Sequence, residues 1–262
     1  MSVKYYLSLC VIIKDEMNIE EFIIYYRILG VEHFYIYDNE CAYPLQDRLH
    51  ASFFKDMCTI LLFPGKCQQM NAYNHCIEYF KLDTNWLIIV DADEYIFPKK
   101  ENHLSIRDFL NEYEEFHAIG INWVMFGTSY HDVKQTGFVI DKYRYCSNDQ
   151  NQHIKTILKP LYVKYIDNPH YVQLIDPTKY RDPYLNIISG PFNHHYTIDI
   201  IQINHYWSRS VEDMIEKYNR GNADTYQKIV IPPEPHRDNN DKIDNDLPNK
   251  YLQTLYHVFN CI

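Results

Sequence analysis

The stretch that decides the fold of this protein is Trp86-Leu87-Ile88-Ile89-Val90-Asp91-Ala92-Asp93-Glu94-Tyr95-Ile96-Phe97-Pro98, an apolar run that ends in three carboxylates. Five successive apolar residues, three of them β-branched, predict a strand that is covered on both faces, as in a parallel sheet. The acids follow at the carboxyl end of this strand, the edge at which open α/β sheets bind ligands. Two Asp residues one position apart at that edge can share a divalent cation and its phosphate-bearing ligand.

Acids after a strand also cap helices or solvate turns, so a bare Asp-x-Asp pair is a weak signal that needs context. Here Pro98 closes a second short apolar segment, residues 95–97. The acids are therefore expected in a tight, specified bend rather than a loose loop. This context favours a binding site.

The composition is that of one globular domain. The 262 residues are 46% hydrophobic and 23% charged, without a low-complexity block or a Gly/Ser linker, and a chain of this length buries one sizeable core. We predict order throughout, except near Pro232–Asn245, which is rich in Pro, Asn and Asp.

The charge balance excludes one class of partner. With 25 basic and 35 acidic residues the formal net charge is −10, which disfavours nucleic-acid binding because a phosphate backbone requires a basic face. A small anionic ligand is compatible with this charge when a cation and a few local basic residues neutralise it. Tyr occurs 25 times, and its ring can stack on bases or sugars, but most copies are expected to be structural.

The cysteines and the amino terminus indicate the cellular compartment of the protein. The seven Cys residues are odd in number and lack the spacing of a zinc site, which predicts free thiols in a reducing compartment. We find neither a signal peptide nor an apolar run long enough to cross a bilayer. The expectation is a soluble, cytoplasmic protein.

Strands and helices alternate in the first part of the chain. Apolar patterns predict strands over residues 7–13, 33–38 and 59–63 and helices over 19–29, 45–55 and 68–80 before the strand at Trp86. This order predicts a parallel sheet with right-handed crossovers, a Rossmann-like nucleotide-binding half. Polar residues end several of these strands and should converge on one edge: Lys14-Asp15-Glu16, Asp38-Asn39, Asp91 and Asp93.

The pattern changes after Pro98. A helix capped by Ser105 is followed by predicted strands over residues 119–127, 137–140, 154–166 and 201–207, which indicates a mixed sheet. Ser210, with Asp213 three residues later, predicts a helix that ends at Gly221. A closing amphipathic helix is expected near 247–259.

Six ordered blocks of the sequence resemble glycosyltransferase family 92 and its neighbours with the GT-A fold. They are Cys10–Glu16, Leu29–Asn39, Gln69–Cys76, the Asp91 block, Asn122–Gly127, and Asn204-His205-Tyr206 with Arg220–Asp224. Asp15 departs from the family pattern, which has Asn at this position. Many eukaryotic members carry an amino-terminal membrane anchor, and the sequence predicts none here.

The resemblance implies an α/β fold of the GT-A type. Residues 1–262 would form a single domain, with 1–98 as the nucleotide-sugar-binding half and 99–262 as a mixed-sheet acceptor half with the carboxyl-terminal helices. The implied activity is sugar transfer of the hexosyltransferase type, with Mn²⁺ or Mg²⁺, from a nucleotide-diphosphate sugar, UDP-sugar favoured. The acceptor would be a hydroxyl of a glycan or glycoprotein, and transfer would invert the anomeric centre.

The resemblance also implies roles for individual residues. Asp93 would bind the metal directly, and Asp91 would reach the ribose or, through water, the metal. His205 would complete the metal shell, with His194-His195 as weaker competitors. The remaining donor-site residues are Asp15, Glu16 and Asp38 for base and ribose, Gln69, and the cations Lys155, Arg209, Lys217 and Arg220 for the diphosphate; for each cation an exposed surface role is the alternative.

Inversion requires a base that takes the proton of the acceptor hydroxyl. Four residues in loops after the second-half strands are candidates, and the sequence does not rank them: His131, Asp132, His170 and Asp176.

Two other functions are compatible with the acids. A metal-dependent nucleotidyltransferase or phosphohydrolase also uses paired Asp residues, but it usually brings a Gly-rich phosphate loop, and none is visible among seven Gly. A non-catalytic sugar-binding protein could retain the fold, although the intact acids argue against it.

Overall fold

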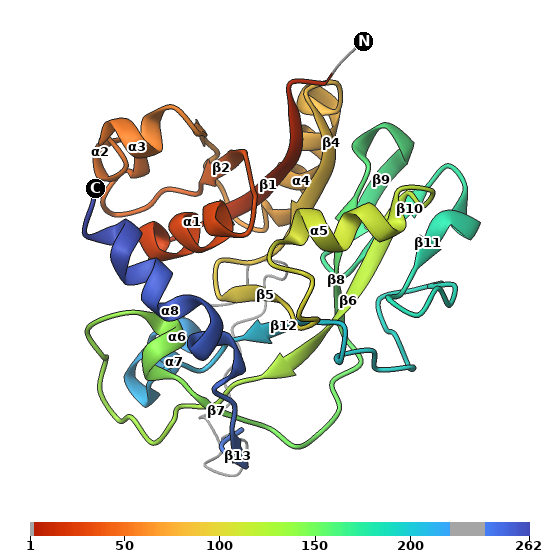
Figure 1. Ribbon diagram of the computed structural model, residues 1–262. Helices are drawn as coiled ribbons and strands as arrows, with labels where there is room; N and C mark the ends of the chain where they lie inside the picture. The colour runs from red at the N-terminus through yellow and green to blue at the C-terminus, as the bar shows by residue number, and fades with distance from the viewer. Residues whose placement is uncertain (1–2, 221–238) are drawn as a thin grey trace.

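The computed structural model describes residues 3–220 and 239–262, in which strands and helices form one mixed α/β body (Figure 1). A nine-stranded sheet runs in the order β3-β2-β1-β4-β8-β6-β12-β5, with β11 (Tyr180–Arg181) beside β6. The predicted end of a helix at Gly221, the block residues 222–224 and residues 232–238 of the expected disordered stretch lie outside the described residues.

The amino-terminal half of the sheet is parallel, as predicted. It consists of β1 (Tyr5–Ile13), β2 (His33–Asp38), β3 (Cys58–Leu62) and β4 (Thr84–Ile89), all paired in parallel. The crossovers contain α1 (Ile19–Ile28) and α4 (Gln69–Phe80). This alternation confirms the Rossmann-like half.

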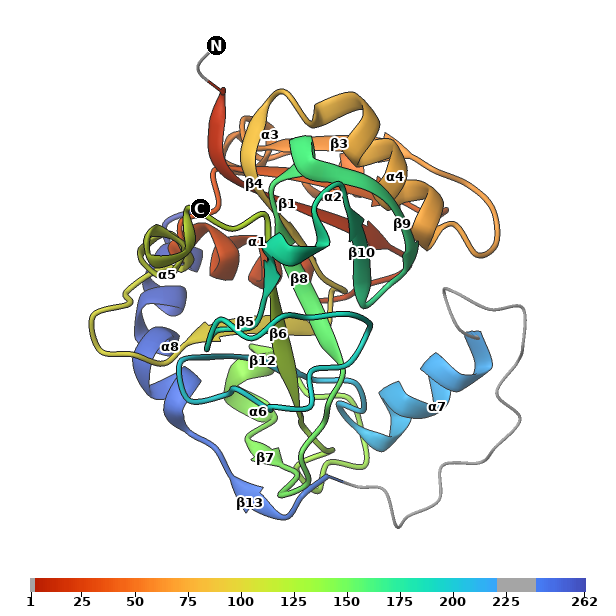
Figure 2. The same cartoon turned by 90° about the vertical axis from the view of Figure 1, so that its right-hand side faces the viewer.

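The strand at Trp86, β4, is covered on both faces. Its side chains alternate between two buried clusters: Trp86, Ile88 and Val90 pack in one, and Leu87 and Ile89 in the other. The first cluster lies under α1, α5 (Ile106–Leu110) and α8 (Asp246–Phe259), and the second under α4 and a hairpin of β9 (Val163–Asn168) and β10 (Tyr171–Leu174) (Figures 1 and 2). The prediction of a central strand, made because apolar and polar residues do not alternate in this run, is therefore confirmed.

The second half of the sheet is mixed, as predicted. Strand β8 (Ile154–Leu158) is antiparallel to both β4 and β6 (Ala118–Met125). Strand β12 (Ile201–His205) is parallel to β6 and antiparallel to β5 (Glu94–Pro98). Further elements of the described residues are β7 (Tyr145–Cys146), β13 (Lys242–Ile243), α7 (Val211–Arg220) and the short 3-10 turns Asn111–Tyr113, Pro160–Tyr162 and Pro177–Lys179.

Three predicted elements differ from the structure. The single helix expected over 45–55 is two short helices, α2 (Leu45–Arg48) and α3 (Ser52–Lys55). The His50 imidazole binds the Asp47 carbonyl at 2.6 Å, a group that would accept the bond of residue 51 in a continuous helix. The strand expected over 154–166 is divided into β8 and β9 by the 3-10 turn that begins at Pro160.

The strand expected over 137–140 is wrong, because this segment forms α6 (Val139–Lys142). The carboxylate of Glu21 in α1 accepts the amides of Val139 at 2.8 Å and Ile140 at 3.3 Å and thereby caps this helix. A residue more than one hundred positions away supplies the cap, so local apolar pattern could not reveal it.

None of the helices in the described ranges is long and apolar enough to cross a membrane. All seven cysteines carry free thiols. The compartment stays a prediction.

Candidate functional site

A cavity of about 650 Å³ opens at the carboxyl ends of β1, β2, β3 and β4. The predicted polar strand ends do converge there: Lys14, Asp15, Glu16, Asn39, Asp91 and Asp93 line it. The second half contributes Trp123, Pro169, His170 and His205, and α7 lies along the cavity in the lower right of Figure 2. The cavity is thus built from both halves of the chain.

The turn that carries the acids is fixed by backbone contacts. The Asp91 amide donates to Glu94 Oε2 at 2.8 Å, and the Glu94 amide donates to the Asp91 carbonyl at 3.1 Å. The Tyr206 amide, at the end of β12, donates to the Asp93 carbonyl at 2.8 Å. The tight bend predicted from the sequence is therefore also held from the second half of the sheet.

The side chain of Asp91 is held by three partners. Oδ1 accepts from Gln69 Nε2 at 2.6 Å and the Tyr73 hydroxyl at 3.1 Å, while Oδ2 pairs with Lys155 Nζ at 2.9 Å. Burial disfavours ionisation of Asp91, but the ammonium of Lys155 outweighs it and lowers the pKa of this carboxyl. Asp91 is thus ionised and orients the turn.

Lys155 has a different role from the one predicted. Its side chain is 1% exposed and lies behind Asp91, 3.7 Å from Glu94 Oε2, so it does not reach a diphosphate in the cavity. Burial raises the pKa of Glu94 well above its usual range, and Lys155 balances the charge of Asp91. Gln69, also predicted as a donor contact, shares this supporting position.

Replacing Lys155 with Met is expected to lower the free energy of unfolding by about 2–3 kcal/mol, because Asp91, whose side chain is 33% exposed, loses the cation that compensates its charge. The melting temperature should fall by roughly 4–12 °C in a protein of this size. Differential scanning calorimetry measures both. Lys164→Met, which removes an exposed cation from β9, is the matched control, and equal melting temperatures of the two variants would contradict this role.

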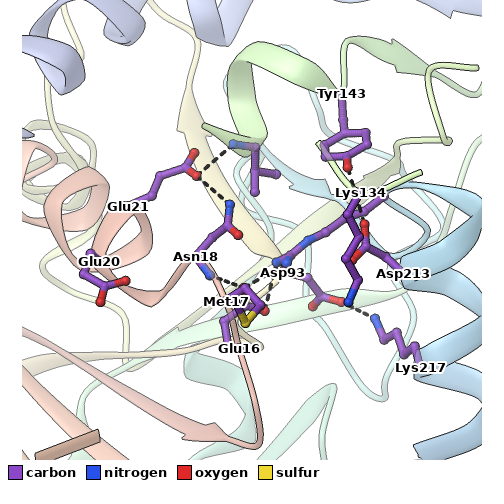
Figure 3. A network of polar contacts seen from close by, with 12 residues as sticks. Glu16, Met17, Asn18, Glu20, Glu21, Asp93, Lys134, Tyr143, Asp213 and Lys217 are labelled. Atoms are coloured by element: carbon purple, nitrogen blue, oxygen red, sulfur yellow. Dashed lines mark hydrogen bonds and ion pairs between the residues drawn. The ribbon is translucent and has the colours of Figure 1, made fainter. Parts of the chain in front are cut away.

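Asp93, like Asp91, lines the cavity. Its Oδ2 pairs with the Lys217 ammonium from α7 (Figure 3). Its Oδ1 lies 3.6 Å from His205 Nε2. Burial opposes ionisation, but Lys217 and His205 hold the pKa of Asp93 well below its usual range. Burial lowers the pKa of His205, whose Nδ1 has no hydrogen-bond partner within the described residues.

Helix α7 brings cations to the cavity without entering the core. A capping box of Ser210 and Asp213 starts this helix, as predicted, and none of its described residues is buried. Lys217 binds Asp93 and the Trp207 carbonyl, and Arg220 donates to the Lys14 carbonyl at 2.8 Å. These polar contacts hold α7 at the site, together with the Tyr218 ring, whose centroid lies 5.2 Å from that of Trp207.

Arg209 is also placed at the site. Its guanidinium forms a two-pronged ion pair with Glu16, at 2.8 and 2.9 Å, and so joins the turn after β1 to the segment after β12. Figure 3 shows that hydrogen bonds extend this contact: the Asn18 amide donates to Glu16, and the Asn18 side chain donates to Glu21. The Arg209 side chain is 13% exposed, which makes the predicted surface alternative wrong.

Four residues of the cavity have left-handed backbones: Asp15, Glu40, Cys67 and Arg209, with φ of 54°, 58°, 54° and 49°. Non-glycine residues rarely adopt this conformation, and such residues cluster at functional sites. Asp and Asn are the side chains that tolerate it best, which explains why Asp15 can stand where the family pattern has Asn. The Asp15 carboxylate accepts the Ala42 amide at 2.7 Å and thus joins two loops at the cavity.

Asp38 was predicted to contact the base and ribose of the donor, but the structure places it in a turn outside the cavity lining. Its Oδ1 accepts the Cys41 amide and its Oδ2 the Leu45 amide, each at 2.9 Å, and it is outside the cavity lining. Asp38 therefore shapes the turn before α2, and the residues of this turn that line the cavity are Asn39 and Glu40.

Only one of the four candidate bases lines the cavity. His170 does. Asp176 is half-buried and accepts the amide and hydroxyl of Thr178, His131 binds the Lys142 carbonyl at 3.2 Å, and Asp132 is an exposed residue of the same loop. These three residues lie outside the cavity lining, so the structure does not bring them together with His170.

The sequence interpretation gave no role to Trp123 and Lys134, which line the cavity. Trp123 lies at the carboxyl-terminal part of β6, and its ring centroid is 4.2 Å from that of His205. The sequence did contain a signal for Trp123, because a large aromatic residue near the carboxyl end of a predicted strand lies close to the edge where ligands bind. Lys134 pairs with Glu216 of α7 at 2.6 Å.

The residues fit a divalent cation in part. Asp93 Oδ1 and His205 Nε2 approach one another in the cavity and supply one oxygen and one nitrogen, both acceptable to Mn²⁺. Asp91 is engaged by its own partners, and His194 and His195 are exposed. Since the described residues hold no group of three His, Cys, Asp or Glu ligands, the other positions of a shell fall to phosphate oxygens or water.

The comparisons with known proteins now identify the class. The model of Glycosyltransferase family 92 matches residues 65–246, which is more than half of the chain. The protein therefore belongs to glycosyltransferase family 92. Curated proteins give no significant match.

Two solved structures with a similar arrangement have low sequence identity. TarS 1-349 from S. aureus, in complex with UDP, has a TM-score of 0.40 and 14% identity over 63% of this chain and 49% of its own. A putative glucose-1-phosphate thymidylyltransferase from Bacillus anthracis, in complex with a sucrose, has a TM-score of 0.36 and 6% identity over 59% of this chain and 72% of its own. The chain thus spans about half of the TarS structure.

Proposed function

We propose that the protein is a metal-dependent glycosyltransferase that moves a sugar from UDP-sugar to a hydroxyl of a glycan or glycoprotein, with inversion and with Mn²⁺ or Mg²⁺. In a chain of this family, the observation that supports this most directly is the approach of Asp93 Oδ1 and His205 Nε2 to 3.6 Å in the cavity. One residue comes from each half of the chain, so the pair exists only in the folded protein.

The chain's own groups suggest how the donor would lie. The turn after β1, Asn39 and residues 65–68 form the part of the cavity that would receive uracil and ribose. Lys217 and Arg220 would meet the diphosphate, which gains negative charge as the anomeric bond breaks. A divalent cation, when bound, supplies further positive charge to this leaving group.

His170 is the residue we propose as the base. Its Nδ1 lies 3.1 Å from the Ile154 carbonyl, and because a carbonyl only accepts, Nδ1 carries the hydrogen and Nε2 the lone pair. Nε2 would accept the proton of the acceptor hydroxyl while the hydroxyl oxygen attacks the anomeric carbon. The bond to the diphosphate breaks in the same step, which inverts the centre.

Replacing His205 with Ala is expected to weaken Mn²⁺-dependent UDP binding by about one to two orders of magnitude, the scale on which metal sites lose affinity when supporting groups are removed. Isothermal titration calorimetry of UDP with Mn²⁺ measures this directly, without any turnover. His195→Ala, an exposed imidazole, is the control. Equal UDP affinities in wild type and His205→Ala would remove His205 from the metal shell.

Transfer activity separates this proposal from the two alternatives. A nucleotidyltransferase or phosphohydrolase would cleave within the nucleotide or the diphosphate, whereas a glycosyltransferase releases intact UDP from UDP-sugar, with water as a slow acceptor. A non-catalytic sugar-binding protein would release none. Product analysis by mass spectrometry after incubation of UDP-sugars with Mn²⁺ distinguishes the three.

A further inference from the structure

Each of the two acids after β4 is paired with a cation that the chain itself supplies. Asp91 Oδ2 pairs with Lys155 Nζ at 2.9 Å, and Asp93 Oδ2 pairs with the Lys217 ammonium. Two carboxylates and two ammonium groups bring two negative and two positive charges, so these four side chains together carry no net charge. A divalent cation that enters the cavity alone is therefore attracted weakly, because the affinity of oxygen ligands for such ions depends on their negative charge.

The two lysines differ in how firmly they are held. Lys155 lies on the central strand β8, its side chain is 1% exposed, and it has Asp91 and Glu94 beside it. The Lys217 side chain is 26% exposed and comes from α7, in which none of the described residues is buried. Lys217 can therefore leave its acid by rotation of its own flexible side chain, without repacking of the core. Lys155 cannot.

In the free protein Lys217 obstructs the approach of a metal ion to Asp93. The ammonium binds Oδ2, while Oδ1 lies 3.6 Å from His205 Nε2. A cation held by Oδ1 and this imidazole nitrogen would have the ammonium on the other oxygen of the same carboxylate. The Asp93 side chain is 13% exposed, so water screens the repulsion between the two positive charges poorly.

The surroundings of Lys217 show which ligand can withdraw it from Asp93. Its ammonium also donates to the Trp207 carbonyl at 3.3 Å, and Arg220 on the same helix donates to the Lys14 carbonyl at 2.8 Å. All four of these residues line the cavity, so an anion that enters there meets both cations of α7. A nucleoside diphosphate has enough negative charge to bind a divalent cation and Lys217 at the same time.

We propose that Lys217 takes the place of the metal ion at Asp93 in the free protein and moves to the diphosphate when metal and nucleotide bind together. This inference rests on the proposed function, to which it adds the exchange of partners. Metal and nucleotide then bind cooperatively, because the nucleotide removes the ammonium that opposes the metal and the metal frees the ammonium that the nucleotide needs. By linkage, each ligand raises the affinity of the other by the same factor.

Lys217→Met tests the exchange, because it removes the ammonium and keeps most of the length of the side chain. Calorimetric titration of MnCl₂ in the absence of nucleotide should show binding about three- to tenfold tighter than in wild type, since the metal no longer displaces an ion pair. Titration of UDP at saturating Mn²⁺ should show binding about tenfold weaker, since a charge-assisted contact with the diphosphate is lost. A merely structural role of Lys217 would not change the two affinities in opposite directions.

Two further variants separate occupancy of the acid from other effects. Lys217→Arg keeps the positive charge beside Asp93 and should bind Mn²⁺ alone no more tightly than wild type. Lys134→Met is the matched control within the cavity, because Lys134 lines it but pairs with Glu216 at 2.6 Å. It should keep the Mn²⁺ affinity of wild type. Melting temperatures measured by differential scanning calorimetry establish that each variant is folded.

The outcomes distinguish failure of this inference from failure of the proposed function. Unchanged or weaker Mn²⁺ binding by a folded Lys217→Met variant, or an equal gain in Lys134→Met, would overturn the exchange. The donor proposal would still stand if wild type binds UDP with Mn²⁺. Wild type that binds UDP equally with Mn²⁺ and with EDTA, or does not bind UDP at all, would instead remove the metal-dependent function and the exchange with it.

Discussion

Asp93→Asn is expected to lower the rate of UDP release from UDP-sugar by about 100- to 1000-fold, the scale on which enzymes lose rate when one preorganised electrostatic group is removed. Asn keeps the shape of the side chain but loses the charge that pairs with Lys217 and approaches His205. The turn itself should persist, because the Asp93 carbonyl accepts the Tyr206 amide in either variant.

Initial rates at saturating Mn²⁺ and several UDP-sugar concentrations give kcat and KM, and calorimetry gives UDP affinity. Asp176→Asn is the matched control, since Asp176 lies outside the cavity lining and its carboxylate accepts a hydrogen bond from Thr178. A folded Asp93→Asn variant with the wild-type rate would show that Asp93 has no part in the reaction.

His170→Ala is expected to lower kcat by about 100- to 10,000-fold, the contribution typical of a positioned base. Donor binding should change little, because the base contacts the acceptor hydroxyl. Added imidazole should restore part of the activity of His170→Ala by occupying the space of the lost ring. His131→Ala, which removes an imidazole outside the cavity, should retain the wild-type kcat.

The pH dependence gives an independent check of the base. Burial is the main cause that lowers the pKa of His170 to about 4; Lys155 lowers it further, Asp91 opposes the shift, and the neighbouring His153 adds to it. A base acts in its deprotonated form, so kcat/KM should stay level as the pH falls from 8 to roughly 5 and decline only as it approaches the pKa of the free protein. A decline centred near 6.5, the value of an unperturbed His, or an unchanged profile in His170→Ala, would contradict this role.

Several features of the site could be predicted from the sequence because their causes are local. The apolar run at Trp86 determined a central strand, since no polar residue in it could face water. The capping boxes of Ser105 with Asp108 and Ser210 with Asp213 fixed the starts of α5 and α7 within four residues of chain. Asp91 and Asp93 follow the apolar run of β4 directly, so the end of this run predicted that they lie at the sheet edge.

The tertiary structure decided which of the strand-end acids serve the cavity. Asp38 and Asp93 both follow apolar strands, yet Asp38 is consumed by the amides of Cys41 and Leu45, whereas Asp93 receives partners from β12 and α7. The two acids differ because the chain after β2 folds back onto the Asp38 carboxylate, whereas distant elements contact the Asp93 carboxylate. A carboxylate accepts from any suitable amide or ammonium, so its type in the sequence does not specify its partner.

At three further positions the residue type alone also did not specify the partner, and only the fold decided the role. Lys155, His170 and Glu21 are each polar residues whose roles come from burial and from partners that lie far along the chain: Asp91 for Lys155, the Ile154 carbonyl beneath His170, and the α6 amides for Glu21. Periodicity and caps record interactions within a few residues, and these the sequence determined. Charge compensation, tautomer and access to the cavity depend on desolvation by the whole fold, so only the tertiary structure could assign them.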